Sequence, residues 1–513
     1  MNQTVTVNQT EIITSSSEPY IQGLRAFFTG LLIPCGFAPF HMPGLAILGI
    51  AVLFIQINQL TIKQSFSTGF LFGLGFFGLG ISWVYTSIHN FGHLNILASA
   101  SLTFLFIAYL ALYPGIMMLL YKKLALNRSL LSKCSLFSAL WCLSEFLRST
   151  FLSGFPWLLL GTGQIDTPLK YLLPIIGIFG VGFITCFAGT ILGAGMQDIR
   201  TKRYKWMIVF ISIILTPSVL KNQQWSIVSP SSISTGIIQA NLSMRDKWDE
   251  ALFWQIMQRY QGYVKQLLGK TELIVMPESA IPVPLNYVSD FLENLNQDAK
   301  QTDSAILLGI PEPTSTDDSA YYNSMTTLGL AKGSYQKQHL VPFGEFIPHP
   351  FQHLSDWLNV PMANMKPGKH HQPLILIKNH PIASLICYEV AYPQLLRKQL
   401  PQAEWIVSIS DDGWFGHSFA IYQQLQMAQV LSLQTGRFQV VANNDGLSSI
   451  INTEGDVVDS LPAFSSGVLS SSIQPATGKT PWVVMGDTPI LLISLSIFLT
   501  ALMGLSRKRK KSS

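Results

Sequence analysis

Charged residues are scarce in this sequence. Lysine and arginine contribute 33 of the 513 residues and aspartate and glutamate 28, so 12% of the chain is charged while 48% is hydrophobic. A soluble globular domain carries about 25% charged residues. The scarcity excludes a chain that is soluble along its whole length and predicts that a large part lies in a membrane. The net charge, +5, is small for this length and gives no indication of nucleic-acid binding.

Cysteine is also rare, and the pattern that would make it structural is missing. The five cysteines form no CxxC pair and no Cys/His ligand spacing, so neither a disulfide framework nor a zinc site is expected, and we expect no metal and no cofactor. Four of them precede residue 200, in apolar segments, which leaves Cys387 alone in the polar part of the chain. A free cysteine is usually a small buried hydrophobe. Because Cys387, in "ASLICYEVAYP", has no partner cysteine in this part of the chain, we expect it to be present for its reactivity.

Apolar runs long enough to cross a bilayer, which requires about 20 residues, dominate the first half. Arg25 is the first basic residue, and neither a basic n-region nor a small-residue cleavage site precedes it, so no removable signal peptide is expected. About eight transmembrane helices are predicted, at 23–40, 43–59, 67–88, 95–121, 134–155, 168–195, 206–222 and 483–505.

Lysine and arginine mark the cytoplasmic side of a membrane because they resist translocation. They occur after the second, fourth and sixth runs and in the tail "SRKRKKSS", whereas the loops "HMPG" and "HNFGH" have none. Both termini are therefore predicted to be cytoplasmic and the long polar stretch to lie on the far side. The expected divisions are an N-terminal segment 1–22, a seven-helix domain 23–224, a water-soluble domain 225–480, a last helix 481–505 and a basic tail 506–513.

Residues 225–480 alternate short apolar runs with helical patterns, which is typical of an α/β domain with a covered sheet. Helices are expected at 249–266 and 419–435. Strands are expected at 235–242, 272–278, 304–313, 324–330, 374–379, 382–389, 404–412 and 438–445.

Three polar residues in this domain combine into a chemical hypothesis. Glu278 ends the run "LIVMPES", Lys337 lies in "YQKQHLVPFGEF", and Cys387 ends "ASLIC". Taken singly they are ordinary: a helix cap, a surface lysine and a buried thiol. Together they fit covalent acyl transfer, in which the carboxylate is the base that activates the thiol and the ammonium stabilises the oxyanion. Lys337 is also expected to help Cys387 ionise.

The motifs "MPES", "YQKQHLVPFGE" and "LICYE", in this order, resemble the Glu-Lys-Cys motifs of the nitrilase (carbon–nitrogen hydrolase) superfamily, whose fold is an αββα sandwich. With the flanking spans, "RDKWDE", "ISWVYTSI", "LSEFLRSTFLSGFPWLLLGTGQID" and "DDGWFGHS", nearly the whole chain resembles the apolipoprotein N-acyltransferase family of the bacterial inner membrane. The resemblance implies a polytopic helical membrane domain joined to a nitrilase-like domain in the periplasm.

Carried over residue by residue, the resemblance implies that Cys387 is the nucleophile, Glu278 the general base and Lys337 the stabiliser of the tetrahedral intermediate. Glu345 is similar to an additional essential acid of the family. Two residues along an extended chain, Glu389 would share a face with Cys387 and oppose thiolate formation, so we expect a role in structure or substrate orientation.

Other residues of the family's motifs are expected to support the site or bind substrate. Tyr388 follows the nucleophile as it does in the family, and "DDGWFG" departs from the Asn-Asp-Ala that relatives often have there, which puts that loop's polar contacts in question. The residues expected to border the acyl pocket are Trp248, Trp414 and Phe415.

The implied reaction moves an acyl chain from a phospholipid of the phosphatidylethanolamine type to Cys387 as a thioester. The acyl chain then passes to the α-amine of a lipoprotein's N-terminal diacylglyceryl-cysteine. The apolar stretches 355–358 and 359–364 are expected to be lids. Two alternatives stay open: a membrane-anchored amidase that releases its acyl group to water, and a scaffold or transporter with an inactive domain.

Glu145 and Arg148 lie within a predicted span and are three residues apart on one helical face, so they could pair. Charges inside a membrane are costly and often functional. Contact with the phospholipid headgroup, or a channel to the site, is one interpretation. The other is that both lie near the far interface.

Overall fold

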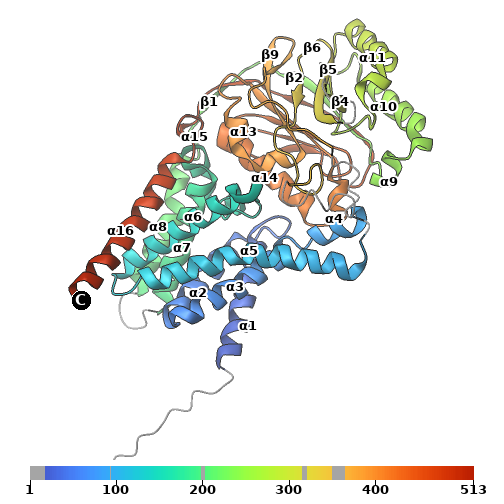
Figure 1. Ribbon diagram of the computed structural model, residues 1–513. Helices are drawn as coiled ribbons and strands as arrows, with labels where there is room; N and C mark the ends of the chain where they lie inside the picture. Colours follow the sequence, from blue (N-terminus) through green and yellow to red (C-terminus); the bar gives the residue numbers. More distant parts are fainter. Residues whose placement is uncertain (1–17, 93, 198–202, 315–319, 349–363, 513) are drawn as a thin grey trace, which may run out of the picture.

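The computed structural model describes residues 18–92, 94–197, 203–314, 320–348 and 364–512. A helical part and an α/β part are stacked end to end, with the α/β part seated on one end of the helices (Figure 1). The helices of the first part are α1 (Glu18–Leu31), α2 (Pro43–Gln59), α3 (Ile62–Gly80), α4 (Val84–Phe91), α5 (Ile96–Leu124), α6 (Leu130–Thr150), α7 (Leu173–Gln197), α8 (Arg203–Leu215), α15 (Pro481–Met485) and α16 (Thr488–Ser512). Short 3-10 turns join them: η1 (Pro34–Gly36), η2 (Phe151–Ser153), η3 (Thr162–Gln164), η4 (Pro168–Leu172) and η5 (Thr216–Leu220).

Each of the eight predicted apolar segments contains a helix, but fewer than eight of these helices are long enough alone to cross a bilayer. Among the described residues, four meet the length and hydropathy of a span: Ile96–Leu124, Leu130–Ser153, Pro168–Gln197 and Thr488–Leu505. A fifth results if α3 and α4, bent by 61° at their break, count together. Pro43–Gln59 and Tyr204–Leu220 are shorter apolar helices. The multi-span membrane part is confirmed, and the number eight stays a prediction.

Small residues allow the helices of the membrane part to pack closely. Gly73 of α3 lies so near α5 that a Cβ atom there would come within 2.7 Å of the Ala111 Cα atom. Membrane helices gain little from the hydrophobic effect against lipid and associate through such close backbone contact. The contact aligns α3 with α5 beneath the α/β part.

The α/β part contains two main sheets that pack face to face, each covered by helices, so the predicted αββα sandwich is confirmed. One sheet has six strands in the order β14-β2-β3-β4-β5-β7 and the other seven in the order β13-β12-β11-β10-β9-β8-β6. A small third sheet pairs β1 with β15. The strands are β1 (Ser226–Val228), β2 (Ile233–Gln239), β3 (Leu273–Val275), β4 (Ala305–Pro313), β5 (Tyr321–Gly329), β6 (Ala331–Lys332), β7 (Tyr335–Gln336), β8 (Ile375–Ile377), β9 (His380–Ile386), β10 (Trp405–Ser410), β11 (Gln439–Asn443), β12 (Ser449–Ile451), β13 (Val457–Ser460), β14 (Gly467–Ile473) and β15 (Ala476–Gly478).

The central strands of both sheets are parallel, and they are buried on both faces. β2, β3 and β4 pair in parallel, as do β9, β10 and β11. Their continuous Val/Ile/Leu runs follow from this double covering. The helices of this part are α9 (Met244–Lys247), α10 (Phe253–Leu267), α11 (Ser289–Gln301), α13 (Pro393–Arg397) and α14 (Ala420–Thr435), with the 3-10 turns η6 (Glu250–Leu252), η7 (Leu285–Tyr287), η9 (Cys387–Ala391) and η10 (Asp412–Phe415).

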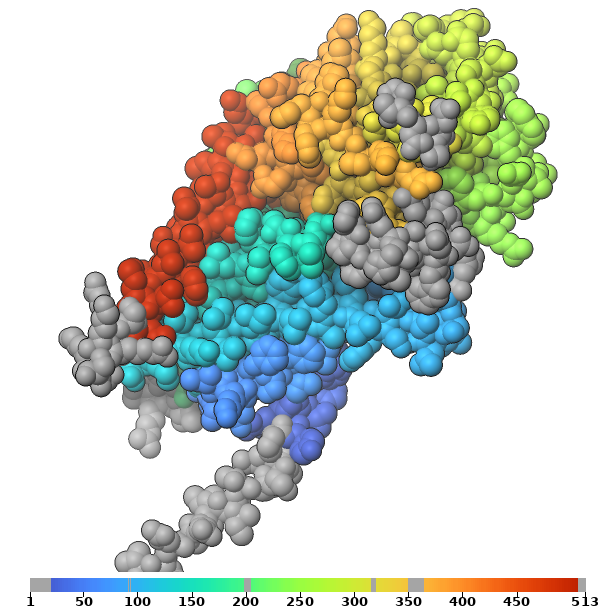
Figure 2. Space-filling view, viewed as in Figure 1, coloured from blue at the N-terminus to red at the C-terminus, as the bar shows by residue number. Residues whose placement is uncertain are grey.

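Helix α14 joins the two parts. It contacts α7 of the membrane part, and Figure 1 shows it at the junction. The Trp157 indole donates to Gln423 Oε1 at 2.6 Å, and the Ala38 amide donates to Gln426 Oε1 at 3.1 Å. Seen as solid surfaces from the same side, the α/β residues pack directly against the helical ones (Figure 2). The carboxyl ends of the central strands therefore lie close to the membrane part.

Candidate active site

Glu278 lies just beyond β3 and is held from several sides. Its Oε1 accepts from the Asn323 side chain at 2.7 Å and from the Lys337 ammonium at 3.4 Å. Its Oε2 accepts from the main-chain amide of Asp411 at 2.9 Å. These donors fix the direction of the carboxylate, as a general base requires.

Lys337 follows β7 and is 1% exposed. Its ammonium lies 2.7 Å from Glu345 Oε1 and 3.4 Å from Glu278 Oε1. Burial alone would lower the pKa of Lys337, but the negative charges of Glu345 and then Glu278 outweigh it and raise the pKa above its usual value. Lys337 is therefore a permanent cation. Glu345 is itself fixed by the Asn323 amide at 3.0 Å and the Val341 main-chain amide at 2.8 Å.

Cys387 begins the turn η9 directly after β9, with φ at 53° and 6% of the residue exposed. Positive φ at a residue other than glycine is uncommon and typical of functional sites. It lies close enough to Glu278 and Lys337 for their charges to affect its ionisation. The structure thus brings the three predicted residues together.

Lys337 acts on the Cys387 thiol in the expected direction, but other groups outweigh it. Burial, and then the negative charge of Glu278, raise the pKa of Cys387 well above its usual value, and the opposing effect of Lys337 is smaller. Lys337 therefore does not produce a stable thiolate. Glu278, whose charge acts on Cys387, is a carboxylate placed to take up the thiol proton.

Glu389 joins the Lys337 loop to the nucleophile turn. Its Oε1 accepts from the Gln338 amide at 2.7 Å, its Oε2 from the Ile386 amide at 2.9 Å, and both oxygens from the Tyr335 hydroxyl at 3.1 Å. Burial raises the pKa of Glu389 to about 7 despite these donors. The two amide contacts hold the Lys337 loop and the end of β9 together beside Cys387.

Tyr388 turns toward the membrane part, where an aromatic cluster begins. Its ring stacks on Trp157 with the centroids 6.3 Å apart. Phe415 packs against Trp83 at 4.9 Å and Trp157 at 6.1 Å. We call Trp83, Trp157, Tyr388 and Phe415 the aromatic cluster. It forms an apolar connection between the helices and the residues next to Cys387.

The other two predicted pocket aromatics lie differently. The main-chain oxygen of Trp414 accepts from the Ser87 hydroxyl at 2.8 Å, which ties η10 to α4. Trp248 follows α9 and is 41% exposed. The lid segments 355–358 and 359–363 lie outside the described residues, and Asn364 pairs with Phe346 in an isolated bridge.

Glu145 and Arg148 are both buried in α6, yet they are not among the ion pairs formed by the described residues. Glu145 Oε1 accepts from the Leu160 amide at 2.8 Å. Arg148 Nη1 donates to the main-chain oxygens of Phe155 and Trp157, each at 2.7 Å. The ion pair suggested by their spacing is wrong: one atom of each group binds the loop backbone instead, while Glu145 Oε2 and Arg148 Nη2 are buried without a hydrogen-bond partner among the described residues. They hold the loop that carries Trp157.

Two residues of the site, Asn323 and Lys247, are not among the site residues predicted from the sequence. Asn323 lies within β5 and bridges Glu278 and Glu345, but an amide inside a strand has no distinctive pattern. Lys247 belongs to "RDKWDE", where only the tryptophan was assigned. Its ammonium is buried between the Glu278 main-chain oxygen and the Asp411 carboxylate. The loop in question, "DDGWFG", is thus well anchored.

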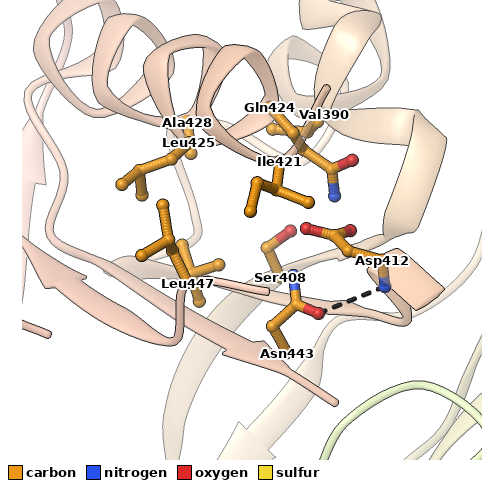
Figure 3. Close-up of a pocket in the computed structure, with 10 residues that line it drawn as sticks. Val390, Ser408, Asp412, Ile421, Gln424, Leu425, Ala428, Asn443 and Leu447 are labelled. Atoms are coloured by element: carbon orange, nitrogen blue, oxygen red, sulfur yellow. Dashed lines mark hydrogen bonds between the residues drawn. The ribbon is translucent and has the colours of Figure 1, made fainter. Parts of the chain in front are cut away.

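A cavity of about 10 Å³ lies between α14 and the ends of β10 and β11. In Figure 3, Gln424 and Asp412 point toward each other across it. Burial raises the pKa of Asp412 to about 7. A space of this size holds about one water molecule, so it is too small for an acyl chain. Within the described residues, no three His, Cys, Asp or Glu side chains are grouped to hold a metal ion.

The two parts of the chain match two family models. Residues 29–191 match the apolipoprotein N-acyltransferase N-terminal domain, and residues 235–480 match carbon–nitrogen hydrolase. The class of protein is therefore a carbon–nitrogen hydrolase domain joined to a multi-span membrane domain.

Relatives of nearly the same length define the family further. The apolipoprotein N-acyltransferase of Methylococcus capsulatus is 35% identical over 495 residues, covering 96% of this chain and 97% of the relative. The apolipoprotein N-acyltransferase of Coxiella burnetii is 35% identical over 493 residues, covering 94% of this chain and 100% of the relative. That of Haemophilus influenzae is 33% identical over 498 residues, covering 94% of each chain. This chain belongs to the apolipoprotein N-acyltransferase family.

Proposed function

We propose that this chain transfers an acyl chain from a membrane phospholipid, through a thioester on Cys387, to the α-amine of the N-terminal diacylglyceryl-cysteine of apolipoproteins. The observation that carries the proposal is the buried Glu278–Lys337–Glu345 group beside Cys387. The aromatic cluster offers an apolar approach from the membrane part.

In the first half-reaction, Glu278 accepts the Cys387 proton as the sulfur attacks the ester carbonyl of the donor. The oxyanion of the tetrahedral intermediate is stabilised by the Lys337 ammonium, a kind of interaction worth a few kcal/mol per donor. When the intermediate collapses, the ester C–O bond breaks and Glu278 returns the proton to the departing lysophospholipid. Cys387 is left as a thioester.

In the second half-reaction, the lipoprotein amine attacks the thioester carbonyl and Glu278 accepts a proton from it. The C–S bond breaks, the amide is formed, and the proton passes to the Cys387 sulfur. Two substrates visit one acylated enzyme in turn, which is ping-pong kinetics. Glu345 keeps Lys337 in place, Glu389 orders the nucleophile turn, and Glu145 and Arg148 act through the Trp157 loop. Trp248, Trp414, Phe415 and Tyr388 border the acyl chain.

The donor is proposed to be a phospholipid of the phosphatidylethanolamine type. The catalytic domain is proposed to lie in the periplasm, with both termini cytoplasmic, because lysine and arginine gather in alternate loops and in the tail. In the proposed orientation, Cys387 faces the outer leaflet, where its lipid substrates are.

The test is intact-mass analysis of the full chain in micelles containing phosphatidylethanolamine. Wild type should gain one acyl-sized mass and lose it when a diacylglyceryl peptide with a free amine is added. Cys387→Ala should gain nothing, while Cys35→Ala, which removes another free cysteine, should behave as wild type. Equal labelling of Cys387→Ala would refute the proposal. Loss of the acyl group in buffer alone would instead identify an amidase.

A further inference from the structure

Lys247 connects the two sheets of the sandwich at the edge where the catalytic residues lie. It ends α9, and its ammonium donates to the main-chain oxygen of Glu278, beyond β3 of the six-stranded sheet, at 2.9 Å. The same ammonium forms an ion pair with the carboxylate of Asp411, which follows β10 of the seven-stranded sheet. The Lys247 side chain is fully buried in this position.

Asp411 in turn holds the general base. Its main-chain amide donates to Glu278 Oε2 at 2.9 Å. Its Oδ1 accepts from the Asn444 side chain at 3.1 Å and from the Gly413 amide at 3.2 Å, so the orientation of this peptide is fixed. Since β10 pairs directly with β9, whose last residue, Ile386, precedes Cys387, Asp411 belongs to the same sheet as the nucleophile.

We infer that the Lys247–Asp411 ion pair positions Glu278 against Cys387 across the two sheets and balances the charge beside them. Lys247 fixes the main chain of the base, and Asp411 fixes one of its carboxylate oxygens. Neither side chain touches the reacting atoms, so both are positioning residues. The effect of the ion pair on the rate of acylation rests on the proposed function. Its effect on the ionisation of Cys387 does not.

Removing one member of the pair leaves the other as an unbalanced buried charge. The two substitutions are therefore expected to shift the pKa of Cys387 in opposite directions. Lys247→Met leaves a carboxylate near the site, which disfavours loss of a proton from Cys387. Asp411→Asn keeps the main-chain amide and leaves an ammonium, which favours it. A nearby charge shifts the pKa of a group by on the order of one unit. Cys387 also faces the charges of Glu278, Lys337 and Asp412, and the pair also faces Asp445; these four groups are the same in every variant. A purely structural role does not produce opposite shifts.

The first measurement is alkylation of Cys387 by iodoacetamide as a function of pH, in the full chain in detergent, followed by peptide mass. The midpoint should rise in Lys247→Met, fall in Asp411→Asn and return close to that of wild type in the double variant. This readout needs no acyl donor. The alkylation measurement therefore tests the role of the ion pair even if wild type takes up no acyl group. Failure of wild type to take up an acyl group would count against the proposed function alone.

The second measurement is the single-turnover rate of Cys387 acylation by phosphatidylethanolamine, per folded enzyme and relative to wild type at each pH. Lys247→Met should be at least ~10-fold slower, because small displacements of a reacting group cost up to about a hundredfold. The double variant should stay slow although its charge is balanced, because the bond to the Glu278 main chain is lost.

The matched control is Lys378→Met. Lys378 precedes β9 and pairs with Glu272, which precedes β3, at 3.3 Å, so it joins the same two sheets at their opposite ends. Its rate and midpoint should match those of wild type. The inference is overturned if both single variants share the wild-type midpoint, or shift in the same direction, or if Lys247→Met acylates at the wild-type rate.

Discussion

Buried charges are handled in two ways in this molecule. In the membrane part, Glu145 and Arg148 are each bound by main-chain groups of the loop that follows α6. In the α/β part, Lys337 is bound by two side-chain carboxylates, Glu278 and Glu345. A charged group that binds main-chain groups holds that stretch of backbone in place. A charge satisfied by other ionisable groups can change its partners as protons and oxyanions appear, which makes the second arrangement suitable for catalysis.

Removing the Lys337 ammonium from the group of side-chain charges should have the largest effect on the rate of acylation. Lys337→Met leaves Glu278 and Glu345 as buried carboxylates without a counter-charge, and no ammonium remains for the oxyanion. Loss of a single oxyanion donor costs about 10²–10³ in rate, so we expect acylation of Cys387 to fall by at least that factor. The measurement is the single-turnover rate by intact mass. Lys337→Arg keeps the charge and should retain more activity; equal loss in both variants would show that charge is not the essential property.

Glu345→Gln tests whether the negative charge of the second carboxylate that pairs with Lys337 is needed for catalysis. The amide keeps one acceptor for Lys337 but loses the negative charge that helps to hold the ammonium next to Glu278. We expect acylation to slow by about 10-fold to 100-fold, within the range of acid–base and positioning effects. Glu312→Gln is the control, since Glu312 accepts from Ser324 and Gln336 on neighbouring strands without contacting Lys337. An unchanged rate in Glu345→Gln would make Glu345 dispensable for catalysis.

The sequence predicted those parts of the site that lie directly after apolar runs, and missed those that depend on burial. Glu278 and Cys387 end strands that are visible in the residue pattern, and the family resemblance adds Lys337. The raised pKa of Cys387 depends on burial, which no local pattern reports. Glu145 and Arg148 have the spacing of a helical ion pair, but a loop folded against α6 offers them backbone partners. Sequence spacing indicates which side chains are neighbours, not which partner they choose.

The fold, like the site, has features that local sequence patterns predict and others that depend on tertiary contacts. Alternation of apolar strand patterns with helical ones was enough to predict an α/β domain with a covered sheet, and the family resemblance added the αββα sandwich. The break between α3 and α4 lies inside one continuous apolar run, where hydropathy gives no sign of a 61° bend. That bend brings α4 against η10, and with it Ser87 to the main chain of Trp414. The junction that positions the aromatic cluster is thus a tertiary feature.

Arg148→Met should weaken the enzyme by a smaller amount and in a different way. The variant leaves the main-chain oxygens of Phe155 and Trp157 without their donor, and a buried unsatisfied polar group costs about 1–3 kcal/mol. We expect a lower thermal unfolding midpoint and, because Trp157 stacks on Tyr388, a higher KM for the phospholipid with kcat changed less. Thermal unfolding and steady-state kinetics in micelles measure both. A variant with a lower kcat and unchanged stability would place Arg148 in the catalytic group instead.

The smallest expected effect concerns Asp412, a buried carboxyl group that is in none of the ion pairs formed by the described residues. Burial raises the pKa of Asp412 to about 7, although Ser410 donates to it at 2.8 Å. A carboxyl whose pKa is raised on folding contributes stability that is present below its unfolded pKa of about 4 and is lost as the pH rises through its folded value. At pH 8 the wild type therefore carries a buried charge that Asp412→Asn lacks. We expect the unfolding temperature of Asp412→Asn, relative to wild type, to be higher at pH 8 than at pH 5. A difference that does not vary with pH would mean that Asp412 does not titrate between pH 5 and pH 8 and would contradict the raised pKa.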